Sequence, residues 1–136
     1  MKQMPLLFLL TLLLISFPAG CGRKKNNSHK TAPPNITING VSYPIYKNSE
    51  LLQNAGIIIT FHTDADPLNV RQWYDTKMKA EGWTDNGGWD MLGGTFQKSF
   101  TSAKDKHKIV RITTGKDKKR GGTHYSIIPI IFPKTK

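Results

Sequence analysis

The sequence predicts an α+β fold, in which an antiparallel sheet of about four to five strands packs one face against a single amphipathic helix. Strand-like segments precede and follow one helical segment, and those after it are separated by short polar turns. In residues 107–114, Val110 and Ile112 alternate with polar side chains. Such alternation indicates a sheet that is buried on one face and solvated on the other.

The helix is expected directly after Asp66. Asp66 precedes Pro67, so the aspartate can cap the helix and the proline can be its first residue. Gly82 is expected to end it. The apolar side chains recur at three- and four-residue spacing and form one stripe, made by Val70, Trp73, Tyr74 and Met78.

Two stretches of strand are expected before the helix. A turn at Asn39-Gly40 lies between alternating apolar residues, which is typical of a hairpin. Residues 43–52 indicate an extended edge or a loop, because they contain a proline and an Asn-Ser pair. Residues 57–62 are β-branched and aromatic, which predicts a strand.

A meander is expected after the helix. Breaks are expected at residues 86–88 and at Gly93-Gly94, and strands at 95–101, 107–114 and 123–131. Pro129 lies within the last of these strands, which suggests an edge or a bulge at that point.

The N-terminal 20 residues have the three parts of an export signal. Lys2 gives a positive start, residues 6–17 are apolar and uncharged, and small residues follow. The apolar stretch is shorter than the roughly 20 residues that span a membrane. A buried helix is the alternative, but the stretch lacks the polar face that such a helix would show.

Ala19, Gly20 and Cys21 resemble the lipobox of bacterial lipoprotein precursors. The resemblance implies cleavage between Gly20 and Cys21, and attachment of lipid to the Cys21 thiol. Pro18 departs from the leucine that the family prefers three residues before the cysteine, so ordinary signal cleavage stays open. Cys21 is the only cysteine, which excludes an internal disulfide and a cysteine-based metal cage.

The expected organisation is a signal peptide at 1–20, a flexible tether at 21–35 and one domain at 36–136. We therefore expect a protein of the cell envelope, anchored outside the cytoplasm through lipid on Cys21. Gly22 follows the cysteine where the family's inner-membrane retention signal has aspartate, so an outer membrane is favoured if two membranes are present.

The chain is strongly basic, with a formal net charge of +11 at pH 7. Removal of residues 1–20 takes away one lysine and no acid, which leaves about +10. Export argues against nucleic acid as the partner and points to anionic lipid or an envelope polymer.

Two basic runs lie in the predicted turns of the meander. One contains Lys104, Lys106 and Lys108. The other is the candidate anion-binding site, made by Lys116, Lys118, Lys119 and Arg120. Successive turns of a meander lie at opposite ends of the sheet, so the two runs are expected to remain apart. The alternative for both runs is an ordinary solvated loop.

A small hydrolase or a metal-binding protein is the remaining alternative, and an enzyme would require a pocket lined by His62, Asp64 and another titratable group. His62, Asp64 and Asp66 are spaced two residues apart, as metal ligands on one face of a strand would be, but Asp66 is explained as a helix cap. No nucleophile or phosphate-loop motif is present. The chain is therefore interpreted as a non-enzymatic binding or assembly module without a cofactor or resident metal.

The strand and helix at residues 60–83 resemble a segment of small, mostly uncharacterised bacterial lipoproteins. The shared residues are Thr63, Asp64, Trp73, Tyr74, Met78, Gly82 and Trp83. The resemblance implies the same fold and no particular activity. Trp73 and Trp83 are expected in the core, and Trp89, in a glycine-rich loop, is expected to be exposed.

Overall fold

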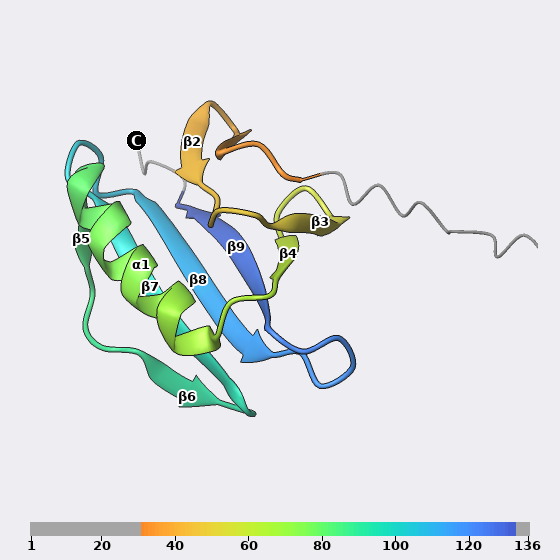
Figure 1. Cartoon of the computed structure of the whole chain (residues 1–136). Coiled ribbons are helices and arrows are strands. Elements are labelled where there is room, and N and C mark those ends of the chain that lie inside the picture. Colours follow the sequence, from red (N-terminus) through yellow and green to blue (C-terminus); the bar gives the residue numbers. More distant parts are fainter. Residues whose placement is uncertain (1–30, 133–136) are drawn as a thin grey trace, which may run out of the picture.

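The computed structural model describes residues 31–132 (Figure 1). The expected signal, its cleavage site at Gly20 and Cys21 and most of the expected tether lie outside these residues. The described chain forms one helix and two antiparallel sheets, which confirms the predicted α+β class. Its elements in order are β1 (Asn35–Ile38), β2 (Val41–Pro44), β3 (Glu50–Asn54), β4 (Ile59–Thr63), α1 (Pro67–Ala80), β5 (Trp83–Asp85), β6 (Asp90–Leu92), β7 (Thr95–Ser102), β8 (Lys108–Lys116) and β9 (Thr123–Ile131).

The helix begins and ends where the sequence predicts. Asp66 is its N-cap, and the carboxylate accepts a hydrogen bond from the backbone N–H of Leu68 at 2.8 Å. Glu81 is the C-cap, and Gly82 follows with a φ of 83°, a left-handed conformation that glycine adopts at little cost. The stripe faces inward, since Tyr74 and Met78 are fully buried.

The main sheet has seven strands, more than predicted, in the order β3-β4-β9-β8-β7-β5, with β6 also paired to β7. β1 and β2 form a separate hairpin whose turn is Asn39-Gly40, as expected. β9 lies in the middle of the main sheet, between β4 and β8. Pro129 is nevertheless at a local edge. It pairs with Val110 of β8, while pairing with β4 ends at Ile127, so no strand on that side needs its missing N–H.

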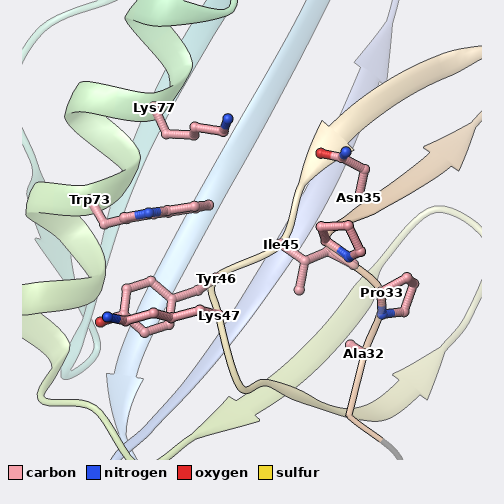
Figure 2. Close-up of a pocket in the computed structure, with 9 residues that line it drawn as sticks. Ala32, Pro33, Asn35, Ile45, Tyr46, Lys47, Trp73 and Lys77 are labelled. Carbon is pink, nitrogen blue, oxygen red and sulfur yellow. The ribbon is translucent and has the colours of Figure 1, made fainter.

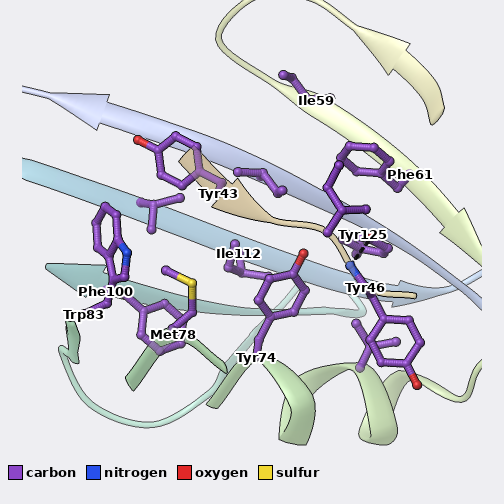
Figure 3. Packing of buried hydrophobic residues seen from close by; sticks show 14 of the residues in the cluster. Tyr43, Tyr46, Ile59, Phe61, Tyr74, Met78, Trp83, Phe100, Ile112 and Tyr125 are labelled. Carbon is purple, nitrogen blue, oxygen red and sulfur yellow. Dashed lines mark hydrogen bonds between the residues drawn. The ribbon is translucent and has the colours of Figure 1, made fainter. Parts of the chain in front are cut away.

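The core lies between α1 and one face of the main sheet (Figure 3). Tyr74 and Met78 project from the helix toward Phe100, Ile112 and Tyr125 of the sheet. Each large apolar side chain buried in this way contributes about 1.5–3 kcal/mol to stability. The β1–β2 hairpin extends the same layer, where Tyr43 contacts Trp83 with 5.7 Å between ring centroids.

Two buried tyrosine hydroxyls hold the segment between β2 and β3. The Tyr125 hydroxyl donates to Ser49 Oγ at 2.7 Å and accepts from the Tyr46 N–H at 3.2 Å. The Tyr74 hydroxyl donates to the Pro44 carbonyl at 3.0 Å. Burial raises the pKa of both phenols, so they remain neutral donors.

Paired structure begins before the expected boundary at Ile36. Thr31 forms an isolated antiparallel bridge with Glu50, and the N–H of Ala32 donates to the Ser49 carbonyl at 2.6 Å. Asn35 is already part of β1. The chain therefore enters the fold beside the first residue of β3.

The face of the main sheet that points away from α1 is called the open face here. One row across four strands carries the polar side chains Thr60, Ser126, Thr113 and Gln97, as the pairing of β4, β9, β8 and β7 shows. Thr60 Oγ1 and Ser126 Oγ lie 2.9 Å apart. This row is polar as predicted, but the open face also carries Ile109, Ile128 and Ile130, so its predicted polar character is observed only in part.

Candidate functional site

The loop between β8 and β9, residues 117–122, packs against the end of β4. Asp117 organises the loop, because one carboxylate oxygen accepts the N–H groups of Lys119 and Arg120 at 2.9 and 3.0 Å. These hydrogen bonds, that of Arg120 first, hold the pKa of the Asp117 carboxyl below its usual range. Gly122 has a φ of 67°, and a Cβ there would overlap the Thr63 carbonyl. The loop therefore lies directly on the backbone that leads into α1.

Two histidines on neighbouring strands lie beneath this loop. His62 and His124 are directly paired between β4 and β9. His62 is buried, and its Nε2 lies 2.9 Å from the Gly121 carbonyl; since a carbonyl only accepts, the nitrogen donates. His124 lies over Gly115, where an added Cβ would be 2.6 Å from its Nε2. His62 thus supports the loop, and His124 lies at its rim.

A hollow of about 520 Å³ opens on the open face beside this loop. We call it the basic hollow. Its lining comes from five separate parts of the chain, namely Leu52, Thr60, Gly93, Gly94, Thr95, Lys116, Asp117, Lys118 and His124. It combines two ammonium groups with hydroxyls and an imidazole, which are groups that bind phosphate or carboxylate oxygens.

The four predicted anion-binding residues do not act as one group. Lys116 and Lys118 line the basic hollow. Lys119 is exposed and does not line it. Arg120 is ion-paired with Glu50. The pattern of charges along the sequence could locate the loop but could not show this division, nor the contributions of Thr60, Thr95 and His124.

The histidine and aspartates spaced two apart do not form a metal site. His62 and Asp64 line a small hollow with Asn48, Glu50 and Arg120, whereas Asp66 caps the helix. Among residues 31–132, no three His, Cys, Asp or Glu side chains are grouped to hold a metal ion. The guanidinium of Arg120 supplies the positive charge beside the carboxylate of Glu50.

A second hollow, of about 240 Å³, lies between α1 and the segment around the β1–β2 hairpin (Figure 2). Trp73 and Lys77 project from the helix toward Ile45 and Asn35. Trp73 makes edge-on contacts with Tyr46 and Tyr74, with centroids 5.3 and 4.9 Å apart. Lys77 is ion-paired with Glu81 at 3.0 Å. Trp73 is therefore only partly buried, with one edge on this hollow.

Trp89 is not exposed, and that prediction is wrong. It is half-buried, and its indole N–H donates to the carboxylate of Asp75 at 3.0 Å. The same carboxylate accepts from the buried ammonium of Lys98 at 2.8 Å, and Lys98 reaches Asp85 at 3.3 Å. Burial alone would lower the pKa of Lys98, but the two carboxylates outweigh burial and raise it. This polar cluster joins α1 to β5, to β7 and to Trp89, the residue before β6.

The two basic runs lie at opposite ends of β8, as expected. Residues 103–107 form the turn before β8, and residues 117–122 form the loop after it. Trp83, by contrast with Trp89, is buried in the core as predicted.

None of the described residues belongs to a helix that is long and apolar enough to cross a membrane. Comparison with protein-family models, curated proteins and solved structures finds no match to the chain. The assignment of function therefore depends on the residues of this chain alone.

Proposed function

We propose that the protein is a lipid-anchored, non-enzymatic binding module of the bacterial cell envelope, and that its basic hollow binds a phosphate- or carboxylate-bearing envelope polymer. One observation carries the proposal: the fold brings Lys116 and Lys118 together with His124 around a concave part of the open face. The anchor is argued separately, from the resemblance of residues 19–21 to a lipobox.

The two ammonium groups of the basic hollow are accessible to an anionic ligand. Lys116 and Lys118 are exposed, and within the described chain neither ammonium is ion-paired with a carboxylate. Asp117 is the only acid in the lining, and two backbone N–H groups already bind one of its oxygens. The positive charge of the two lysines is therefore only partly balanced, and each attracts an anionic ligand.

The shape of the hollow favours a chain-like ligand over a small enclosed one. The hollow lies on a sheet face that continues as the row of Thr60, Ser126 and Thr113. Hydroxyl groups in such a row can donate to successive oxygens of a sugar or phosphate backbone. A polymer can thus extend along the face from the two lysines.

The binding test uses the mature chain that starts at residue 21, carrying Cys21→Ser so that no lipid is present. Binding to soluble anionic wall-polymer fragments is measured by calorimetry at two salt concentrations. The variant Lys116→Gln/Lys118→Gln is expected to bind at least tenfold more weakly. The matched control Lys104→Gln/Lys106→Gln removes the same charge at the other end of β8 and is expected to bind as the parent does. Equal losses in both variants would show general charge attraction and reject the site.

The anchor is tested independently by the intact mass of protein from the membrane fraction. The proposal predicts cleavage before Cys21 and added mass from acyl chains. A Cys21→Ala chain that still sediments with membranes at high salt would exclude the lipid anchor.

A further inference from the structure

The end of the main sheet opposite the basic hollow is apolar and exposed. Ile57 is 68% exposed, Ile131 52%, Phe132 50% and Ile58 40%. Three further isoleucines in the same region are half-buried. We call this set the isoleucine end, and it consists of Ile57, Ile58, Ile109, Ile128, Ile130, Ile131 and Phe132.

The strand register places four of these side chains on the open face, namely Ile58, Ile109, Ile128 and Ile130. Ile131 follows Ile130 and therefore points to the other face, so the set surrounds one end of the sheet. Ile109 of β8 is paired with Ile130 of β9. Ile128 lies two residues before Ile130, and alternate residues of a strand share a face. Ile58 immediately precedes Ile59, the partner of Ile127, so it lies beside Ile128. Scattered apolar residues are ordinary on a protein surface, but a continuous exposed patch marks an interaction site.

Lysines border the isoleucine end. Lys108 is the strand partner of Ile131, and the N–H of Phe132 donates to the His107 carbonyl at 3.3 Å. Lys104 and Lys106, in the same turn, are exposed. The turn's one acid, Asp105, accepts the N–H of His107 at 3.1 Å and lies 4.0 Å from the ammonium of Lys108, so Lys104 and Lys106 supply most of the positive charge. The surface thus combines aliphatic side chains with a positive border.

This combination fits the interface of an anionic bilayer. Aliphatic and aromatic side chains enter the boundary between headgroups and acyl chains, while lysines meet the lipid phosphates. The bilayer is also the one surface that a lipid on Cys21 would bring within reach of the domain.

The length of the tether allows this orientation. The chain enters the fold at Thr31, beside Glu50 at the hollow end of the sheet. From His124 to Ile131 the strand β9 covers about 24 Å at about 3.4 Å per residue. The ten residues from Cys21 to Thr31 can span about 33 Å, so the anchor can reach the membrane when the isoleucine end lies on it.

We propose that the isoleucine end docks on the anionic bilayer that holds the anchor, which turns the basic hollow away from the membrane. This inference rests on the anchor in the proposed function, but its experiment does not use the anchor. Docking through this end of the sheet leaves the opposite end, with Lys116 and Lys118, pointing away from the bilayer.

The experiment measures binding of the mature Cys21→Ser chain to vesicles of phosphatidylglycerol and phosphatidylcholine by flotation. The patch variant is Ile57→Ser/Ile58→Thr/Phe132→Ser. Its matched control is Leu68→Ser/Met91→Ser/Leu92→Thr, which removes three other exposed apolar side chains, 50%, 70% and 66% exposed. Every substituted side chain is at least 40% exposed, so both variants are expected to fold, as circular dichroism will show.

The patch variant is expected to lose at least tenfold in vesicle partitioning, and the control to bind as the parent does. Lys104→Gln/Lys106→Gln is expected to weaken partitioning by about fivefold per lysine and to reduce its salt dependence. Equal losses in patch and control variants would overturn the inference. So would loss of vesicle binding in Lys116→Gln/Lys118→Gln, which would place the basic hollow on the membrane, or a concentration-dependent dimer that the patch variant abolishes.

A lipid-free chain that fails to bind vesicles would overturn bilayer docking. It would leave the proposed lipid anchor standing, because the anchor is tested separately by the intact mass. Absence of acyl mass would overturn the anchor, while the vesicle data would still show whether the isoleucine end binds a bilayer.

Discussion

The two consecutive glycines of the β8–β9 loop offer a matched test of how this loop is held. Gly121 and Gly122 both have positive φ, at 77° and 67°. An added Cβ at Gly121 meets nothing within 4 Å, whereas at Gly122 it would overlap the Thr63 carbonyl and lie 2.8 Å from the Cα of Asp64. Gly121→Ala and Gly122→Ala therefore share the backbone cost and differ in the clash.

The expected magnitudes follow from these two terms. Placing alanine in the left-handed region costs about 1–2 kcal/mol, and this is the whole cost expected for Gly121→Ala. Gly122→Ala adds the cost of forcing an atom into packed structure, about 1–3 kcal/mol. The clash is with backbone, which cannot rotate away as a side chain can. The total is about 2–5 kcal/mol, and the loop is expected to move off β4.

The assay is urea unfolding of both variants and the parent, followed by tryptophan fluorescence. For a domain of this size, each kcal/mol lowers the melting temperature by about 4–8 °C, so a parallel thermal scan is an internal check. Equal destabilisation by the two alanines would refute the packing of the loop on β4. In the Gly122→Ala chain, polymer binding at the basic hollow should fall even under conditions where the protein remains folded.

Three further substitutions test the interior. Thr114→Val is expected to raise stability by about 1 kcal/mol in urea unfolding, because the buried Thr114 hydroxyl has no hydrogen-bond partner within the described structure. Tyr125→Phe is expected to cost about 1–3 kcal/mol, since it leaves the buried N–H of Tyr46 without its acceptor; an unchanged urea midpoint would contradict that bond. Lys98→Met is expected to cost about 1–2 kcal/mol, because Asp75 and Asp85 lose a buried partner. The pKa of Lys98 is raised, so its contribution to the free energy of unfolding is complete at neutral pH and is lost only as pH rises above the ordinary lysine value. The pKa of Asp85 is lowered, first by Lys79 and then by Lys98, so the contribution of this carboxylate to stability is lost in acid. The stability difference between parent and Lys98→Met should therefore be constant from pH 6 to 9 and shrink below about pH 4.

Local chemistry made several elements predictable. The carboxylate of Asp66, the fixed φ of Pro67 and the positive φ of Gly82 act within one or two turns of chain, so the helix could be placed from sequence. The same holds for the Asn39-Gly40 hairpin and for β9, whose nine residues are those expected.

Features that depend on a partner segment were not predicted, even where that partner is close in the sequence. β6 lies between glycine-rich turns and exists because Asp90, Met91 and Leu92 pair with β7, a partner that its own residues do not specify. The burial of Trp89 depends on Asp75, which lies 14 residues away on the helix. The aromatic residue in a glycine-rich loop gave no sign of this hydrogen bond.

In the candidate site, too, some residues were predictable from local sequence and others depended on strand pairing. Lys116 and Lys118 were visible as a basic run, because charge can be counted along the chain. Their association with Thr60 and His124 follows from the pairing of β9 with both β4 and β8. The paired residues of β4 and β9 are at least 60 positions apart, and such pairing leaves no local signal in either segment.

If the chain is exported as we propose, the position of β9 affects how it crosses the membrane. Within the main sheet, β9 alone is hydrogen-bonded to both β4 and β8, so the strands on either side of it cannot join until residues 123–131 are available. A chain exported from its N-terminus delivers those residues after every other strand. The order of the strands would thus keep the main sheet incomplete until β9 has crossed, and the sheet would then form on the outer side.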